Sequence, residues 1–240
     1  MGTAKNNLAP NPERMAARRT RAGRASHLRD VIYGGIDGAV TTFAIVAGVE
    51  GADLSPSVII ALGIANVLAD GFSMAAGNFA GTKADLDDQR RLRAVEDRHI
   101  DVDPDGEREK LREILRLKGL EGELLDQAAD AISAKRSAWV EMMLVEEHGL
   151  SPVNPNPKGA AIATFLAFLI TGTVPLLPFV VGFDDAFQIS AASTAVVFFA
   201  IGAMKSRWSL DPWWKSGLET LLIGGVAAGI AFFVGTLFRG

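Results

Sequence analysis

The sequence predicts an all-α integral membrane protein with five transmembrane helices and a cytosolic helical domain inserted between the second and the third. Three observations predict this fold class. The 240 residues are 49% hydrophobic with a mean hydropathy of +0.22, which is more apolar than an average soluble domain. The apolar residues gather in five long stretches, whereas charged residues gather between positions 82 and 158. In that charged segment apolar residues recur at helical spacing, and strand-like alternation is missing.

Each apolar stretch is close to the roughly 20 residues that an α-helix needs to cross a hydrocarbon layer about 30 Å thick. The five stretches are Val31 to Val49, Val58 to Ala80, Ala160 to Phe183, Phe187 to Met204, and Leu218 to Phe238. The third and fifth are the most apolar. The first two contain acidic and amide side chains and several glycines, so buried helices of a soluble core are an alternative for them.

The distribution of basic residues favours membrane spans over that alternative. Seven Lys and Arg residues precede position 31, thirteen lie in 82–158, and three lie between the fourth and fifth stretches. The two connections on the other face, 50–57 and 184–186, contain none. Because Lys and Arg collect on the cytoplasmic side of short loops, the pattern predicts that the N-terminus and 82–158 are cytosolic and that the C-terminus is outside.

These assignments divide the chain into four parts. Residues 1–30 form a basic, mobile cytosolic tail that attracts anionic lipid, and 31–81 hold the first two spans. Residues 82–158 form a small domain of three or four helices, with breaks at Gly119 and Gly122, and 159–240 hold the last three spans. The second span continues without proline into the charged segment, which predicts one long helix through both parts.

Ionisable groups within spans are costly and usually mark a transport pathway. Asp37 lies in the first span, and Asn66, Asp70 and Met74 follow at intervals of four in the second, on one helix stripe. Oxygen ligands with one thioether suit a divalent ion such as Fe²⁺ or Mn²⁺, and carboxylates that bind a cation release protons. The alternative is structural: Asp70 satisfies a helix irregularity and Met74 packs against a neighbour.

The charged segment carries two further groups of ligand types. Met142, Met143 and Glu146 are three or four residues apart near its end, and Glu96 and His99 are three apart near its start. The remaining candidates in this segment are Glu107, Glu109 and Glu113. Each group alone is typical of a solvated or core helix face, but together they would form a bowl of carboxylate, imidazole and thioether. With no cysteine, thiolate zinc and iron–sulfur ligation are excluded.

Four segments together resemble the vacuolar iron transporter family, as a bacterial-type member, over residues 27 to 240. They read DVIYGGIDGAVTTFAIVAGV, LADGFSMAAGNFAGTKAD, WVEMMLVEEHGL and AAIATFLAFLITGTVPLLPF. The resemblance implies a five-span homodimer whose second helix extends into a cytosolic metal-binding domain. It also implies export of Fe²⁺, often with Mn²⁺, from the cytosol in exchange for protons.

The resemblance assigns roles to particular residues. The family's span-one aspartate falls on Asp37 and its span-two methionine on Met74. Its ligands in the insert fall on Glu96, Glu107, Met142, Met143 and Glu146. Asn66 stands where many members have a glutamate, so proton coupling moves to Asp70 or weakens. His99 stands where some members have a second glutamate. Lys110 lies three residues after Glu107, where another acid could stand, so that Glu109 or Glu113 takes its place.

The sequence therefore predicts a proton-coupled exporter of Fe²⁺ and Mn²⁺ that has no enzyme activity and no prosthetic group. The alternative is a membrane-anchored buffer or sensor of divalent metal without net transport. A ferritin-like oxidase would need paired Glu-x-x-His motifs on facing helices, and only Glu96 to His99 matches.

The expected partners are divalent metal ions, protons, membrane lipid and a second copy of the chain, with no nucleic acid. The homodimer follows from the resemblance, with support from the GxxxG pair Gly225 and Gly229, although the glycines of the first span offer an equal surface. A chain without cysteine or an apolar leader fits a prokaryotic inner membrane.

Overall fold

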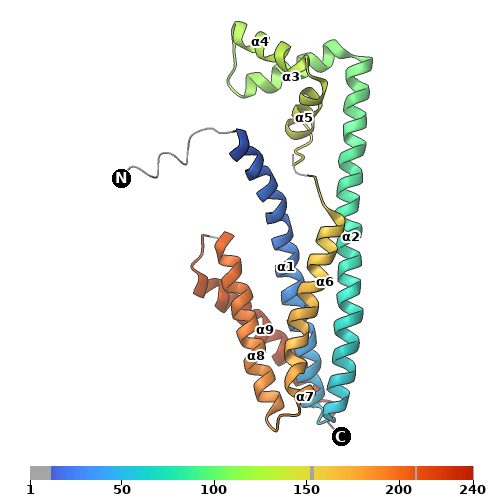
Figure 1. Ribbon diagram of the computed structural model, residues 1–240, viewed down its shortest axis with the longest axis vertical. Helices are drawn as coiled ribbons and strands as arrows, with labels where there is room; N and C mark the ends of the chain where they lie inside the picture. The colour runs from blue at the N-terminus through green and yellow to red at the C-terminus, as the bar shows by residue number, and fades with distance from the viewer. Residues whose placement is uncertain (1–11, 152–153, 209, 240) are drawn as a thin grey trace, which may run out of the picture. The chain divides into compact units, whose positions relative to one another are not determined.

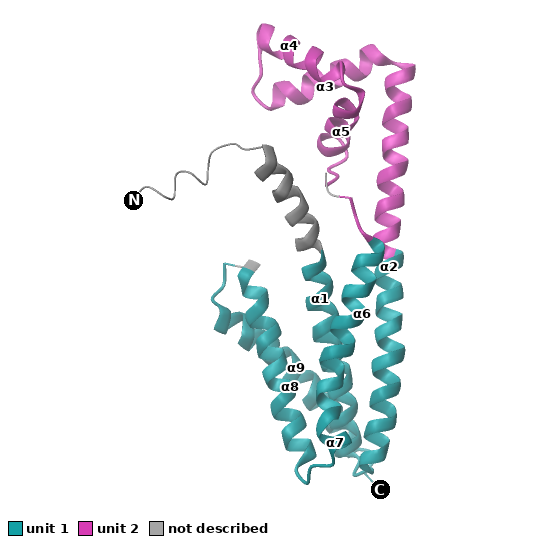
Figure 2. Cartoon of the chain, in the orientation of Figure 1, with its two compact units in different colours: residues 1–80, 157–240 teal, residues 81–156 magenta. Residues whose placement is uncertain are grey.

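The computed structural model describes residues 12–151, 154–208 and 210–239, and within them every regular element is a helix (Figure 1). The all-helical prediction is confirmed. The chain divides into two compact units: unit 1 comprises residues 1–80 and 157–240, and unit 2 comprises residues 81–156 (Figure 2).

Among the described residues, five helices are long and apolar enough to cross a membrane. The candidate spans are His27–Gly51, Pro56–Val102, Pro157–Val181, Ala186–Lys205 and Trp213–Thr236. They coincide with the five apolar stretches. They belong to α1 (Pro12–Gly51), α2 (Pro56–Val102), α6 (Pro157–Thr173) with the 3₁₀ turn η2 (Val174–Leu176) and α7 (Leu177–Val181), α8 (Ala186–Lys205), and α9 (Trp213–Thr236).

Helix α1 is the central helix of unit 1, where it packs on α6, α8 and α9 (Figure 1). Two glycines permit the close approach of α1 to α6. A Cβ atom at Gly34 would lie 2.5 Å from the carbonyl oxygen of Thr164, and one at Gly38 would lie 2.5 Å from that of Phe168. The glycines of the first span are thus used for packing within the chain, as small residues often are in membrane bundles.

Two features of unit 1 differ from the sequence-based expectations. Helix α1 extends back to Pro12, where a mobile tail was expected over 1–30, because residues 13–30 lack proline and are rich in Ala, Arg and other helix formers. Residues 1–11 of that tail lie outside the described residues.

The third span contains the 3₁₀ turn η2 because Pro175 and Pro178 have no N–H to donate. The Ser190 hydroxyl donates to the Pro175 carbonyl oxygen at 2.7 Å.

Helix α2 is continuous for 47 residues, which confirms the long second helix and supplies residues to both units. In unit 2 it is followed by α3 (Pro104–Leu117), α4 (Gly122–Ser133), and α5 (Arg136–Glu146). The breaks predicted at Gly119 and Gly122 are confirmed, since both residues have positive φ, at 90° and 59°.

Unit 2 has its own hydrophobic core. Buried side chains from all four of its helices form it: Ile100, Leu111, Leu115, Leu125, Ala129, Trp139, Val140, Met143 and Leu144. On the surface, Arg136 at the start of α5 ties α5 to α2, with guanidinium contacts of 3.0 Å to Asp97 and 2.6 Å to Asp101. The segment therefore has the packed interior that can hold polar side chains in fixed positions.

Candidate metal sites

The first candidate site lies in unit 1, between α1 and α2. The Asn66 side-chain amide of α2 donates to the hydroxyl oxygens of Thr41, at 3.2 Å, and Thr42, at 3.4 Å, on α1. The Thr41 hydroxyl in turn donates to the backbone carbonyl of Asp37 at 2.9 Å. A polar stripe of α1 therefore faces the predicted stripe of α2.

The register of this antiparallel pair places Asp37 and Asp70 at the same level. Asp70 is four residues after Asn66 on α2, and Asp37 is four residues before Thr41 on α1, so both steps cover about 6 Å of helix rise. Asp37 and Met74 are partly buried, whereas Asp70 is exposed in the single chain. The structure thus brings Asp37, Asn66 and Asp70 to one helix pair, with Met74 one turn further along α2.

Three more polar residues continue this pairing. Asp30 is 5% exposed and accepts a hydrogen bond from the Asn78 amide at 2.9 Å, and Asn78 also donates to the Thr164 hydroxyl of α6 at 2.7 Å. Asp30 was not selected from the sequence. A signal existed, because Asp30 precedes Asp37 by two helical turns and so lies on the same face of α1.

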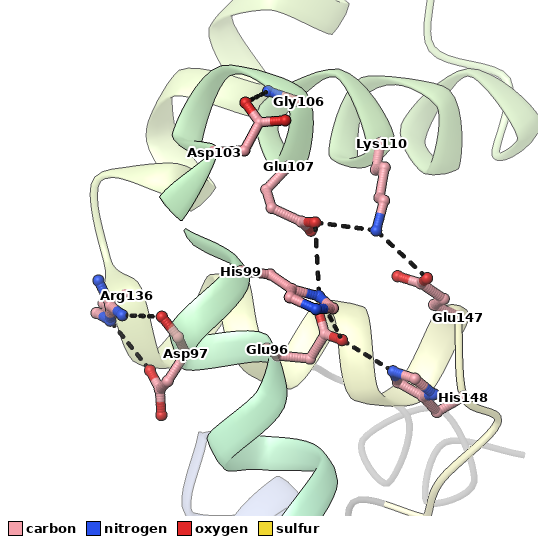
Figure 3. A network of polar contacts seen from close by, with 10 residues as sticks. All are labelled: Glu96, Asp97, His99, Asp103, Gly106, Glu107, Lys110, Arg136, Glu147 and His148. Atoms are coloured by element: carbon pink, nitrogen blue, oxygen red, sulfur yellow. Dashed lines mark hydrogen bonds and ion pairs between the residues drawn. The ribbon is translucent and has the colours of Figure 1, made fainter. Parts of the chain in front are cut away.

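The second candidate site lies in unit 2 and is centred on two buried carboxylates (Figure 3). Glu96 of α2 is 1% exposed and Glu107 of α3 is 5% exposed. The His99 Nδ1 atom lies 3.7 Å from Glu96 Oε1 and 3.8 Å from Glu107 Oε1. The ligand atoms of the three residues all lie within 4.8 Å of one another. The structure therefore brings together three of the predicted ligands from two helices.

Two residues that were not selected from the sequence join this site from the end of α5. His148 Nε2 lies 3.0 Å from Glu96 Oε1, and Glu147 belongs with Glu96 and His148 to a second group whose ligand atoms lie within 4.8 Å (Figure 3). The available signal was their position directly after the Met-Met-x-x-Glu run and the rarity of histidine, with three in the chain.

Lys110 contributes a positive charge to the same site. Its ammonium lies 2.9 Å from Glu107 Oε1 and 3.5 Å from Glu147 Oε1. The hydrogen bond to Glu107, followed by the charges of Glu107, Glu147 and Glu96, raises the pKa of Lys110 above its ordinary value despite some desolvation. The side chain therefore stays charged throughout the neutral range.

One carboxylate oxygen of each buried glutamate has no hydrogen-bond partner among the described residues. These atoms are Glu96 Oε2 and Glu107 Oε2. An unpaired buried acceptor costs roughly 1–3 kcal/mol, and more when it is charged. Two histidines and two unsatisfied carboxylate oxygens give the site the chemistry of a cation-binding centre, and the ammonium of Lys110 competes with a bound ion for Glu107.

The other predicted ligands of the insert lie elsewhere in unit 2. Glu107, Leu111 and Leu115 form the buried stripe of α3, whereas Glu109 and Glu113 are exposed. These two acids pair with arginines of their own helix, Arg112 and Arg116.

On α5, Met143 is fully buried in the hydrophobic core and Met142 packs against that core. Glu146 forms an ion pair with Lys118 at 2.8 Å. Neither Glu146 nor the exposed acids of α3 belong to the two acid–imidazole groups found among the described residues.

Comparison with known proteins decides the family. The model of the VIT family matches residues 28–236. The chain belongs to the VIT family. "Vacuolar iron transporter 1" of Eucalyptus grandis is 33% identical over 210 residues, which are 85% of this chain and 84% of that protein. "Vacuolar iron transporter" of Centaurea cyanus is 34% identical over 213 residues, 85% of each chain.

A more distant VIT relative, "Vacuolar iron transporter" of Toxoplasma gondii, is 31% identical over 227 residues, which are 90% of this chain and 75% of that protein. The resemblance seen in the sequence is thereby confirmed. These VIT relatives are named as transporters and not as enzymes. The comparison leaves the bacterial type and the prokaryotic inner membrane as predictions.

Proposed function

We propose that this VIT-family protein is a transporter that exports Fe²⁺, and also Mn²⁺, from the cytosol in exchange for protons. Membership of the VIT family and five candidate membrane helices support metal transport. The observation that carries the proposal is the pairing of Asp37 and Asp70 at one level between α1 and α2. An acidic side chain at the centre of a span costs about 2.5–3.5 kcal/mol on insertion scales, so two at one level favour a transport pathway.

The chemistry of this pair provides the exchange. Two carboxylates can bind one divalent cation or take up protons, so entry of the metal releases protons and its departure restores them. Asn66 supplies an amide oxygen and Met74 a thioether, and such a mixed ligand set favours first-row ions over Mg²⁺ or Ca²⁺. Asp70 takes the coupling role of the family glutamate that Asn66 replaces.

We further propose a homodimer in which the second copy covers the outer face of α2. Asp70 is exposed in the single chain, at one edge of a wide exposed surface of α2 that also carries apolar side chains, with Leu68 at 54% and Phe72 at 69% exposure. A carboxylate exposed to lipid is costly, whereas a partner helix can shield it. A Cβ atom at Gly225 or Gly229 of α9 would have nothing within 4 Å, so this surface too is open to a partner or to lipid.

In this proposal unit 2 is cytosolic and collects the metal, with the N-terminus on the same side and the C-terminus outside. The charge asymmetry of the connections supports that orientation. Glu96, His99 and Glu107 are the ligands that the geometry of unit 2 supports best. The roles of Glu109, Glu113, Met142, Met143 and Glu146 stay predictions, as do the lack of a prosthetic group and of a nucleic-acid partner.

The buried, incompletely bonded carboxylates of unit 2 also favour a second candidate function. A membrane-anchored metal buffer or sensor would use Glu96 and Glu107 to bind metal without moving it across the membrane. The two functions differ at Asp37, because only a transporter depends on it.

Substitution of Asp37 tests the proposed pathway. Asp37→Ala removes one of the two carboxylates, so we expect Fe²⁺ uptake into proteoliposomes to fall to the level of protein-free vesicles. Glu219→Gln is the matched control, because Glu219 is an exposed acid near the start of α9. Its uptake should equal that of the unmodified protein. Normal uptake by Asp37→Ala would refute the assigned pathway, and absence of flux from the unmodified protein would favour the buffer or sensor.

A further inference from the structure

We propose that His99 and His148 are two imidazole ligands of one divalent ion that Glu96 and Glu107 also bind. Such a centre would make unit 2 selective for borderline ions such as Fe²⁺, Co²⁺, Ni²⁺ and Zn²⁺ over Mn²⁺ and harder ions. The inference rests on the proposed metal-binding role of unit 2 and adds to it a ligand, His148, and an ion class.

Three of the six spacings among the four ligand atoms are close to those of metal ligands. In a tetrahedral site with bonds of roughly 2.0–2.2 Å, neighbouring ligand atoms are about 3.3–3.6 Å apart. Around Glu96 Oε1, His148 Nε2 lies at 3.0 Å and His99 Nδ1 at 3.7 Å. The His99 Nδ1 atom is 3.8 Å from Glu107 Oε1. These three distances bracket the tetrahedral edge. His148 lies within 4.8 Å of Glu96 and Glu147 but not of both His99 and Glu107, so a shared ion requires one imidazole to move toward the other.

The backbone fixes the direction of each imidazole. Glu96 and His99 lie one turn apart on the long helix α2, on the same side. His148 follows the end of α5, where Gly149 has a φ of 65° and the Leu150 N–H donates to the Leu144 carbonyl at 3.0 Å. This left-handed turn stops the helix and holds His148 against Glu96.

An independent observation indicates a cation between these groups. Glu96 and Glu107 are both more than nine-tenths buried, yet each keeps one oxygen without a hydrogen-bond partner among the described residues. Lys110 compensates part of the negative charge, but within the described part of the chain its ion pairs are with Glu107 and Glu147 and not with Glu96. A metal bound by the two histidines would lie beside the Oε1 atoms of both acids, and bidentate binding would bring the unpartnered Oε2 atoms to the same ion.

The two imidazoles determine the ion class. Neutral imidazole is a good ligand for Fe, Co, Ni, Cu and Zn ions, whereas sites made only of carboxylate and carbonyl oxygens suit Mg, Ca and Mn ions. A centre with two nitrogen and two oxygen ligands should therefore bind Co²⁺ more tightly than Mn²⁺. The simpler interpretation, in which His148 only forms a hydrogen bond to Glu96, predicts that loss of His148 changes the affinity for both ions alike, because Co²⁺ binds more tightly than Mn²⁺ to most sites.

Calorimetric titration of the purified full-length protein in detergent, without a histidine tag, distinguishes these two interpretations. We expect His148→Gln to weaken Co²⁺ binding on the order of tenfold or more, and Mn²⁺ binding by much less. The control is His27→Gln, which removes the one remaining histidine of the chain and lies in unit 1. It should leave both affinities unchanged. An equal loss for both ions, or no loss for either, would overturn the inference.

A second measurement counts the imidazoles without changing a ligand. The His27→Gln protein retains His99 and His148 as its only histidines. With one equivalent of Cu²⁺ added as a probe, pulsed EPR should detect remote imidazole nitrogens from two coordinated histidines. One coordinated imidazole, or none, contradicts the proposed centre even if His148→Gln fails to fold.

The outcomes also separate this inference from the proposed transport function. Fe²⁺ flux into vesicles, combined with a Cu²⁺ probe that shows fewer than two imidazoles, would leave the exporter standing and remove this centre. Two coordinated imidazoles without any flux would establish the centre and exclude the exporter.

Discussion

Lys110 places a positive charge within the proposed metal centre. Its ammonium lies between Glu107 and Glu147. The ammonium neutralises the carboxylates of Glu107 and Glu147, and so competes with a metal ion for them. Because the pKa of Lys110 is raised, chiefly by its hydrogen bond to Glu107, the competition persists at every pH near neutrality.

Removal of this charge should strengthen metal binding. For Lys110→Met we expect a gain of about 1 kcal/mol in the binding free energy of Co²⁺, roughly fivefold in affinity, after allowance for solvent screening of a half-exposed side chain. Calorimetry on the full-length protein measures it. Lys83→Met is the matched control, because Lys83 lies thirteen residues before Glu96, about 20 Å along α2. Equal affinity in the two variants would contradict the role assigned to Lys110.

At the residue scale, some residues of the two candidate sites could be predicted from the sequence and others could not. The four-residue stripe of α2 predicted that Asn66 and Asp70 share a face, and the contacts with Thr41 and Thr42 show which helix that face meets. The sequence could also have separated Glu107 from Glu109, because Glu107 continues the stripe of Leu111. The contact of His148 with Glu96, 52 positions apart, depends on tertiary folding that no local pattern encodes.

At the scale of single helices, hydrophobic length and breaker residues predicted most of the structure. The length of α2 followed from the absence of proline after its first turn, and Gly119 and Gly122 marked the ends of two helices of unit 2. The prolines of the third span also carried a signal for the 3₁₀ turn η2, which hydrophobic length alone does not register. The helical extension of α1 to Pro12 was missed because a basic composition does not by itself distinguish a tail from a helix.

The packing of α1 on α6 predicts different tolerance at two glycines. In Gly38→Ala, the new Cβ would lie 2.5 Å from the Phe168 carbonyl oxygen, so the helices must separate. We expect a loss of about 1–3 kcal/mol in stability, seen as a lower melting temperature in detergent. Gly225→Ala is the control, because its Cβ would have nothing within 4 Å. A melting temperature equally unaffected in both variants would show that α1 and α6 do not approach as described.

For the whole molecule, the segregation of charge and apolar residues predicted two kinds of structure in one chain. The structure has a unit with five helices suitable for a membrane among its described residues and a unit with its own core. Sequence alone could not supply the pairing of α1 with α2, because each polar stripe was visible but its partner was not. The proposed transport depends on that pairing, since it places two acids where a dication and protons can exchange.

Metal flux driven by a pH gradient tests this central claim most directly. The purified protein would be reconstituted into sealed vesicles, and entry of Fe²⁺ followed with and without an acidic interior. Uptake should increase with the imposed gradient, be accompanied by proton release from the vesicles, and stop when an ionophore dissipates the gradient. Fe²⁺ entry that is indifferent to the gradient, with no proton movement, would contradict exchange at the paired carboxylates.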